Sequence, residues 1–292
     1  MENNLSVIIP AKNESVGLRK ILPALREAYP DAQVLIVDDG STDDTADYAR
    51  EQGCDVLSMR YSAGNGAAIK AGLRAAKGEI VVCMDGEGQH DPADIPRLLE
   101  KLQQGYDMAV GARDVGSHAS LPRRFGNAVY NILAGWITGQ QILDLTSGFR
   151  AVRANHFREF LSLLPNGFSY PTTVTMAFFR SGYPVAYVPV AARQREGRSH
   201  IRLARDGVRF FMIIFKVGTL YSPLKIFLPI SALFFATGCG YYLYTFIAAH
   251  RFTNMSALLL VTSVLVFLIG LVSEQITNLI YTTYNRPDDS SR

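Results

Sequence analysis

Short apolar runs rich in β-branched residues alternate with longer amphipathic stretches over the first two thirds of the chain. This pattern predicts strands at residues 5–9, 33–37, 56–59 and 80–84, and helices near residues 16–28, 43–52 and 66–76. Strands that alternate with helices of this length are typical of an α/β fold with a mostly parallel sheet. Such sheets bind ligands beyond the carboxyl ends of their strands, so we expect the functional residues there.

The last third of the chain contains two long stretches without a charged residue, at about residues 226–249 and 253–273. At about 1.5 Å per residue, each is long enough for a helix that crosses a hydrocarbon layer of roughly 30 Å. Their short connection predicts a two-helix transmembrane hairpin, because two such stretches rarely occur together in soluble folds; a buried core hairpin is the alternative. Gly238 and Gly240 would permit close helix packing, which leaves a homo-oligomer open.

A basic segment precedes the hairpin. Residues 193–225 contain eight Lys and Arg residues against Glu196 and Asp206. Positive residues that flank a membrane segment stay in the cytoplasm, so we expect both termini and the α/β domain on the cytoplasmic side of an inner or plasma membrane. Apolar residues in the segment recur at helical spacing beside a row of arginines, which favours an amphipathic helix on an anionic leaflet. A basic linker helix packed on its own domain is the alternative.

These patterns predict four parts of the chain. They are an α/β domain at residues 1–195, a juxtamembrane amphipathic region at 196–222, two transmembrane helices within 223–276, and a cytoplasmic tail at 277–292.

Composition and charge exclude several classes of protein. The chain of 292 residues is 48% hydrophobic and 19% charged, which excludes intrinsic disorder, and its formal charge of +3 argues against a nucleic-acid binder. Its three cysteines are too few and too scattered for a disulfide framework or a zinc site, so we expect a reducing compartment. The phosphate-binding motifs of ATPases and dehydrogenases are absent from the sequence.

Polar segments rich in acidic residues follow three of the predicted strands, at residues 10–14, 38–43 and 85–92. Carboxylates that meet at one sheet edge repel each other unless a hard cation lies among them, and Mg²⁺ or Mn²⁺ suits oxygen ligands and bound phosphate. The pattern therefore predicts a metal and diphosphate site. For any single segment, the alternative is an ordinary polar turn between a strand and a helix.

Five motifs occur in an order that resembles family 2 glycosyltransferases. They are Val7-Ile-Ile-Pro-Ala-Lys-Asn-Glu14, Val37-Asp-Asp-Gly-Ser-Thr-Asp-Asp-Thr45, Gly64-Asn-Gly-Ala-Ala-Ile-Lys-Ala-Gly72, Asp85-Gly-Glu-Gly-Gln-His-Asp-Pro92 and Asp144-Leu-Thr-Ser-Gly-Phe-Arg150. With the segment Arg195-Glu-Gly-Arg-Ser-His200 and the hairpin, they are similar to the polyprenyl-phosphate branch, which includes dolichol-phosphate mannosyltransferases and bacterial polyprenyl-phosphate glucosyltransferases. The resemblance implies a GT-A fold and inverting transfer of a sugar from a nucleotide diphosphate sugar to undecaprenyl or dolichyl phosphate at the cytoplasmic membrane face.

The resemblance also implies roles for individual residues. The nucleotide sugar would contact Pro10, Ala11, Asn13, Glu14, Asp38, Asp39, Gly66 and Asp85. Mg²⁺ or Mn²⁺ would be held by Asp85, Glu87 and Gln89, where Glu87 replaces the usual Asp and is one methylene longer. The acceptor phosphate would contact Arg113, Arg124, Arg195, Arg198 and Ser199. From its position beside the metal motif, and not from the resemblance, we also expect His90 to support the metal ligands.

Asp85, Glu87 and Asp144 are the expected catalytic residues by the same resemblance. Asp144 stands where the wider family carries its general base. A lipid monophosphate is largely ionised near neutral pH, so its oxygen is a nucleophile without proton removal. We therefore expect Asp144 to orient the acceptor or the sugar, with proton abstraction as its secondary role.

Two other functions stay open at this point. A processive polysaccharide synthase would need a Q-x-x-R-W segment, which the sequence lacks, and two helices are too few for a translocation channel. A catalytically silent membrane scaffold of a glycan pathway is supported only by Glu87. Nothing in the sequence distinguishes uridine from guanosine, or one sugar from another.

Overall fold

The fold is that of a computed structural model, which describes residues 4–113, 121–167, 170–191, 215–216 and 218–284. The chain forms two compact units. The first consists of Met1–Gly135 and Gln140–Arg202, and the second of Trp136–Gly139 and Leu203–Arg292. The predicted amphipathic helix falls mainly on residues 192–214, outside the described residues, as do Arg195, Arg198 and Ser199.

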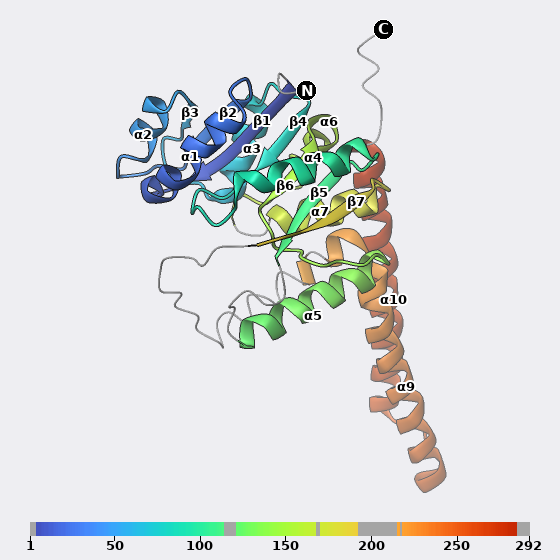
Figure 1. The fold of residues 1–292 in the computed structure, drawn as a ribbon. Helices are drawn as coiled ribbons and strands as arrows, with labels where there is room; N and C mark the ends of the chain where they lie inside the picture. Colours follow the sequence, from blue (N-terminus) through green and yellow to red (C-terminus); the bar gives the residue numbers. More distant parts are fainter. Residues whose placement is uncertain (1–3, 114–120, 168–169, 192–214, 217, 285–292) are drawn as a thin grey trace. The chain divides into compact units, whose positions relative to one another are not determined.

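A seven-stranded sheet with helices packed on it forms the first unit (Figure 1). Its strands are β1 (Leu5–Ala11), β2 (Gln33–Asp38), β3 (Asp55–Ser58), β4 (Ile80–Cys83), β5 (Met108–Arg113), β6 (Arg150–Arg153) and β7 (Val185–Val190). Its helices are α1 (Ser15–Ala28), α2 (Thr45–Glu51), α3 (Asn65–Ala75), the 3-10 helix η2 (Pro92–Asp94), α4 (Ile95–Gln103), α6 (Ala154–Glu159) and α7 (Tyr170–Arg180). Helix α5 (Leu121–Thr138) begins in the first unit and ends in the second.

The strands lie in the order β3-β2-β1-β4-β6-β5-β7. Strand β6 is antiparallel to its neighbours β4 and β5, and the other neighbouring strands are parallel. The sheet is therefore mixed but mostly parallel, as predicted. All four strands predicted from the sequence form near their expected residues.

Central strands of the sheet are apolar because both of their faces are covered. Val7 and Ile9 of β1 are fully buried in the core that also contains Leu18 of α1. On the opposite face, α3 lies so close to β1 that a Cβ atom at Gly72 would be 2.5 Å from Ile8 Cγ2. Helices on both faces explain why these strands have continuous apolar sequences.

The register of the sheet brings the polar segments after β1, β2 and β4 to one edge. Ala11, at the end of β1, is paired with Asp38 at the end of β2. The next amide, Asp39 N, donates to Ala11 O at 2.9 Å. Gly86 follows β4, and a Cβ atom there would lie 3.1 Å from Pro10 O. The expected meeting of these loops is therefore confirmed.

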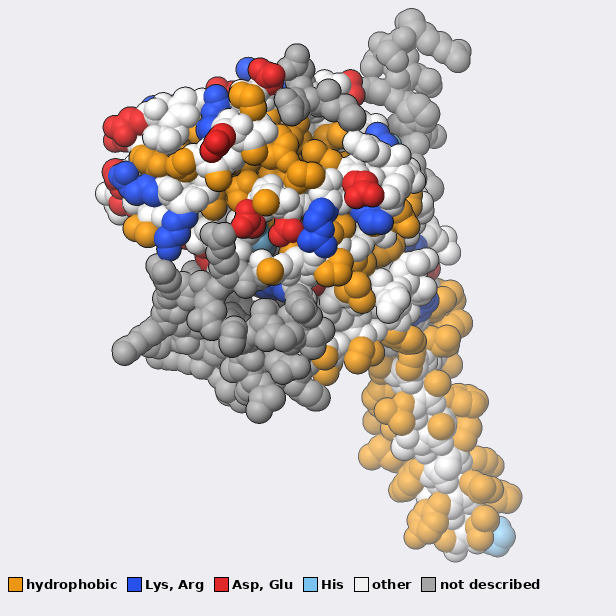
Figure 2. Space-filling view, in the orientation of Figure 1, with side chains coloured by type: hydrophobic (Ala, Val, Ile, Leu, Met, Phe, Trp, Pro, Cys, Tyr) orange, Lys and Arg blue, Asp and Glu red, His pale blue; other side chains and the backbone are white. Residues whose placement is uncertain are grey.

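Two long apolar helices, α9 (Pro223–Ala249) and α10 (Asn254–Tyr284), form most of the described part of the second unit. Both are long and apolar enough to span a membrane. Figure 2 shows apolar side chains over most of their visible surface, as expected for helices surrounded by lipid. Helix α10 continues past Glu274, so residues 277–284, which we predicted as tail, are helical.

Small residues hold the two hairpin helices together. Ser231 Oγ donates to Ser263 O at 2.9 Å, and Ser263 Oγ donates to Ser231 O at 3.0 Å. A Cβ atom at Gly238 would be 3.1 Å from a carbon of Leu260. Close approach at small residues is common between membrane helices. Gly238 therefore allows close packing between the two hairpin helices. A Cβ atom at Gly240 would have no described atom within 4 Å.

Charged side chains satisfy backbone groups at the open end of the hairpin. Glu274 accepts a hydrogen bond from Leu224 N at 3.2 Å, at the start of α9, where amides lack a partner within the helix. Lys225 Nζ donates to Ile137 O at 2.8 Å, near the end of α5. The two charges at this end therefore complete helix termini.

Candidate active site

Hydrogen bonds tie the loop after β1 to the loop after β2. Asn13 has a φ of 56°, a left-handed conformation that Asn tolerates better than most residues. Its side-chain oxygen accepts a hydrogen bond from Thr42 N at 2.8 Å, and its backbone N–H donates to Ser41 Oγ at 2.9 Å. Asp38 Oδ1 accepts from Ser41 N at 2.8 Å. The predicted nucleotide-contacting segment at residues 10–14 is thus fixed by its neighbour.

Asp39 is buried and organises the loop that precedes α3. Its carboxylate accepts hydrogen bonds from Ala63 N at 2.7 Å, Ser62 Oγ at 2.8 Å and Gly64 N at 3.0 Å. A carboxylate bound in this way holds a loop without needing a cation. The contacts of Asp38 and Asp39 with a nucleotide stay predictions.

Gly66 lies where α3 packs against residues 165–167. Its amide donates to Gly167 O at 3.3 Å, and a Cβ atom at this position would overlap Pro165 O. The next amide, Ala67 N, donates to Asn166 O at 2.8 Å. The first amides of α3 therefore bind this loop, which gives Gly66 a packing role that the sequence did not predict. Its contact with a nucleotide sugar stays a prediction.

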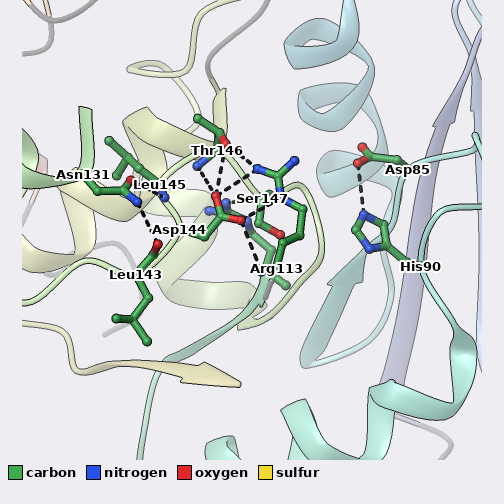
Figure 3. A network of polar contacts seen from close by, with 10 residues as sticks. Asp85, His90, Arg113, Asn131, Leu143, Asp144, Leu145, Thr146 and Ser147 are labelled. Carbon is green, nitrogen blue, oxygen red and sulfur yellow. Dashed lines mark hydrogen bonds and ion pairs between the residues drawn. The ribbon is translucent and has the colours of Figure 1, made fainter. Parts of the chain in front are cut away.

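The metal motif follows β4, and its first carboxylate contacts a buried histidine (Figure 3). Asp85 Oδ2 lies 3.3 Å from Nε2 of His90, whose ring is stacked on Phe149 with centroids 4.9 Å apart. Burial acts to raise the pKa of Asp85, but the hydrogen bond and charge of His90, with the charges of Arg113 and Arg150, hold that pKa below its ordinary value. Asp85 is therefore ionised at neutral pH and available to a cation.

Side chains of the motif have the right chemistry for a divalent ion that is shared with a diphosphate. Asp85 is 31% exposed, and Gln89 Nε2 donates to Glu87 Oε2 at 2.5 Å, so these two predicted metal ligands lie together. Among the described residues, no three His, Cys, Asp or Glu side chains are close enough to hold a metal alone. Oxygen donors of this kind suit Mg²⁺ or Mn²⁺ when phosphate oxygens and water complete the shell of the ion.

Gly17, which the sequence analysis overlooked, fixes the position of the metal loop. A Cβ atom at Gly17 would overlap Gly86 O and lie 2.9 Å from the carbonyl carbon of Glu87. Helix α1 therefore approaches the backbone of the loop as closely as only glycine allows. A glycine in the first turn of an amphipathic helix was the available signal, because glycine there weakens a helix unless close packing requires it.

Asp144 and Arg113 form a bidentate ion pair (Figure 3). Arg113 Nε donates to Asp144 Oδ2 at 2.7 Å and Nη2 donates to Oδ1 at 3.0 Å, with a further bond to Thr146 Oγ1 at 2.6 Å. Burial acts to raise the pKa of Asp144, but the hydrogen bonds and charge of Arg113 and the amide of Thr146 hold it below its ordinary value. A carboxylate with a lowered pKa is a weak base, which favours an orienting role for Asp144.

Asn131 of α5 clamps the loop that carries Asp144. Its side chain donates to Leu143 O at 2.7 Å and accepts from Leu145 N at 3.1 Å. Arg113 was predicted to bind the acceptor phosphate, and its guanidinium is turned towards Asp144 here. The side chain of Arg124, earlier on α5, lies outside the described side chains. The phosphate contacts of both arginines stay predictions.

Arg150 is the last residue of the motif that begins at Asp144, and the sequence predicted no role for it. It begins β6 and is fully buried. A charged residue in a strand of four was the signal available, but it does not indicate what the side chain binds. Its guanidinium donates a hydrogen bond to Ser147 O, in the loop at residues 144–148.

The chain is similar to known glycosyltransferases. Residues 6–161 match the model of glycosyl transferase family 2, and residues 222–279 match that of the GtrB C-terminal hairpin. Glycosyltransferase AglJ of Haloferax volcanii is 28% identical over 246 residues, which are 82% of this chain and 80% of that protein. Undecaprenyl-phosphate mannosyltransferase of Micrococcus luteus is 32% identical over 203 residues, 65% of this chain and 83% of the relative.

The fold is also similar to a solved structure. Glucosyl-3-phosphoglycerate synthase from Mycobacterium tuberculosis, in complex with Mn²⁺, uridine diphosphate and glucosyl-3-phosphoglycerate, has a TM-score of 0.57 at 21% identity, over 72% of this chain and 77% of that chain. A likeness at this identity concerns the fold, and it confirms the expected GT-A architecture. The family match spans more than half of the chain, including the Asp85 and Asp144 motifs. The chain therefore belongs to glycosyl transferase family 2.

Proposed function

We propose that this protein transfers a sugar from a nucleotide diphosphate sugar to a polyprenyl phosphate, with inversion at the anomeric carbon. The observation that carries the proposal is one site in which a half-buried, ionised Asp85 lies near the Arg113–Asp144 pair, in a chain that also contains an apolar hairpin. The name of the Micrococcus luteus relative, which acts on undecaprenyl phosphate, supports the acceptor.

Mg²⁺ or Mn²⁺ is the metal that we expect at Asp85, Glu87 and Gln89. The similar structure with Mn²⁺ and uridine diphosphate supports a divalent ion, and the oxygen donors of the motif suit either metal. A bound divalent ion would neutralise the charge that develops on the leaving diphosphate. Asp85 and Glu87 would provide carboxylates, and the buried His90 would keep Asp85 in place.

The acceptor phosphate supplies the nucleophile in this mechanism. One of its oxygens attacks the anomeric carbon from the side opposite to the diphosphate, which inverts the configuration. No proton has to be removed, so Asp144 acts by orienting Arg113 and the acceptor. The proposed phosphate contacts are Arg113, Arg124, Arg195, Arg198 and Ser199. A guanidinium group can bind two phosphate oxygens at once, and the hydroxyl of Ser199 can donate one further hydrogen bond.

The proposed location is a membrane, with the catalytic domain and both termini in the cytoplasm. Two spans return the chain to the side on which it entered. The excess of Lys and Arg at residues 193–225 supports the cytoplasmic assignment of that side. In this proposal residues 1–195 are the catalytic domain, 196–222 lie at the membrane surface, and 223–276 contain the two spans.

Purified full-length protein offered undecaprenyl phosphate with a panel of UDP-sugars and GDP-sugars would test the function. We expect release of the nucleoside diphosphate and a glycosylated lipid, detected by mass spectrometry, with one or a few of the sugars. Release should require Mg²⁺ or Mn²⁺, and undecaprenol without its phosphate should be inactive. Absence of turnover with every sugar would contradict the proposal and favour a silent scaffold.

Arg124→Ala should weaken use of the lipid acceptor. Loss of a charged hydrogen bond to phosphate removes roughly 1.5–3 kcal/mol, so the KM for undecaprenyl phosphate should rise about tenfold or more. The KM for the nucleotide sugar should change little. Arg97→Ala, which removes a half-exposed arginine paired with Asp94 at 2.7 Å, is the control. An unchanged acceptor KM in Arg124→Ala would place the phosphate elsewhere.

A further inference from the structure

Arg150 is a buried cation that is bound by neutral groups. Its Nη1 donates to Pro171 O at 3.1 Å and to Thr175 Oγ1 at 3.2 Å, and its Nη2 donates to Ser147 O. Its Nε has no hydrogen-bond partner among the described residues. Burial of a charge without a carboxylate partner is unfavourable by several kcal/mol, so Arg150 lowers the stability of the fold unless its charge acts on a nearby group.

The Ser147 carbonyl that Arg150 binds belongs to a turn in contact with Asp85. Gly148 is the next residue, and a Cβ atom there would lie 2.6 Å from Asp85 Oδ1 and 2.8 Å from Oδ2. Tyr170 OH also donates to Gly148 O, at 3.3 Å. The backbone of the turn therefore lies against the carboxylate, with Arg150 and Tyr170 holding it in place.

The sheet explains how Arg150 reaches this position. Arg150 is paired with Cys83 in the antiparallel register of β6 and β4, and Cys83 precedes Asp85 by two residues. The loop that Arg150 holds contains Asp144 as well, which is bound to Arg113. One buried guanidinium thus contacts the segment that links the metal motif to the Arg113–Asp144 pair.

We propose that Arg150 is a positioning residue, which presses the Ser147–Gly148 turn against Asp85 and so holds the metal-binding carboxylate in one orientation relative to Asp144. This inference rests on the proposed function, because it assigns Asp85 to a metal. Gly148 is also required for this contact, since any side chain there would displace the carboxylate of Asp85. Neither residue touches the sugar or the lipid; both act through Asp85.

Gly148→Ala tests the contact without removing a hydrogen bond. The three atoms nearest to the added methyl group all belong to the carboxylate of Asp85, a side chain that is 31% exposed, so Asp85 can rotate away and the protein should unfold at nearly the wild-type temperature. The affinity for Mn²⁺, measured by electron paramagnetic resonance in the presence of UDP or GDP, should fall about tenfold or more. The value of kcat should fall with it, while the KM for undecaprenyl phosphate stays within about twofold.

Arg150→Lys tests the cation, with Arg153→Lys as its matched control. Lysine keeps the charge but cannot reach Ser147, Pro171 and Thr175 together, so Mn²⁺ binding should weaken by a similar factor. Arg153 is at the other end of β6, where it pairs with Asp107 at 3.1 Å, and its replacement should leave Mn²⁺ binding unchanged. The double variant Gly148→Ala/Arg150→Lys should bind little worse than either single variant, because both changes act on one carboxylate.

Wild-type Mn²⁺ affinity in both Gly148→Ala and Arg150→Lys would overturn the inference, as would a wild-type protein that binds no Mn²⁺ with either nucleotide. The proposed function can fail separately. If the wild-type protein transfers no sugar, yet binds Mn²⁺ with a nucleotide more tightly than both variants, the positioning role stands and the transferase proposal falls. If the wild type transfers sugar and both variants bind Mn²⁺ as tightly as the wild type, the transferase proposal stands and the positioning role falls.

Discussion

Asp85→Asn is expected to lower turnover by about 10²–10³-fold while the protein still folds and enters membranes. The replacement keeps the shape of the side chain but removes the charge that would bind the metal, and loss of one electrostatic contact to a developing anion costs roughly 10²–10³ in rate. The lowered pKa of Asp85 means that the charge is present at neutral pH. Release of nucleoside diphosphate, measured with saturating donor and acceptor, checks this prediction.

Asp94→Asn is a suitable control for that experiment. Asp94 lies in η2, shortly after the metal motif, and forms an ion pair with Arg97 at 2.7 Å. Its replacement should leave turnover close to wild type, because a surface ion pair contributes little. Asp85→Asn with full turnover and unchanged metal dependence would remove Asp85 from the metal site.

Arg113→Met should lower the stability of the first unit by about 2 kcal/mol, and removal of Asp144 as well should restore part of that loss. The single change leaves a carboxylate buried without its partner, which costs about 3–5 kcal/mol when both groups are fully buried. Arg113 is 34% exposed, so the smaller value applies. A melting temperature lower by about 4–8 °C would correspond to this change. Arg113→Met/Asp144→Asn should recover at least ~1 kcal/mol, because the unpaired charge is gone.

Acidification provides a second check on the same pair. The pKa of Asp144 is lowered in the folded protein, so the contribution of this carboxylate to stability is present above its ordinary pKa of 3.8 and is lost as the pH falls through the folded value. Protonated Asp144 needs no partner. The difference in melting temperature between wild type and Arg113→Met should therefore shrink as the pH is lowered. If Arg113→Met and Arg113→Met/Asp144→Asn lost the same free energy of unfolding at neutral pH, the two residues would not be a coupled pair.

Much of the fold follows from local patterns. Strands β1, β2 and β4 were predicted because both of their faces are covered, which makes them continuous apolar runs. Strands β5 to β7 were not predicted one by one. Strand β6 has only four residues, begins and ends with Arg, and enters the sheet antiparallel between β4 and β5. That insertion depends on pairing between distant segments, which no local pattern records.

The candidate site divides in the same way. The motifs at Asp85 and Asp144 were visible because each is a short continuous segment with a recognisable order. The Arg113–Asp144 pair joins residues 31 positions apart, and the contact of Gly148 with Asp85 joins two motifs. Gly17 and Arg150 were overlooked because each acts on backbone that is distant in sequence.

The sequence by itself determined the α/β domain, the apolar hairpin and the types of side chain in the site, because burial and membrane length are recorded in the spacing of apolar residues. Only the tertiary structure decided which of those side chains are partners. Hydrogen bonds and close packing depend on distances of a few ångströms between segments far apart in the chain. Arg113 therefore emerged as the partner of Asp144, and Arg150 as the support of the turn against Asp85, only when the strands had been placed side by side.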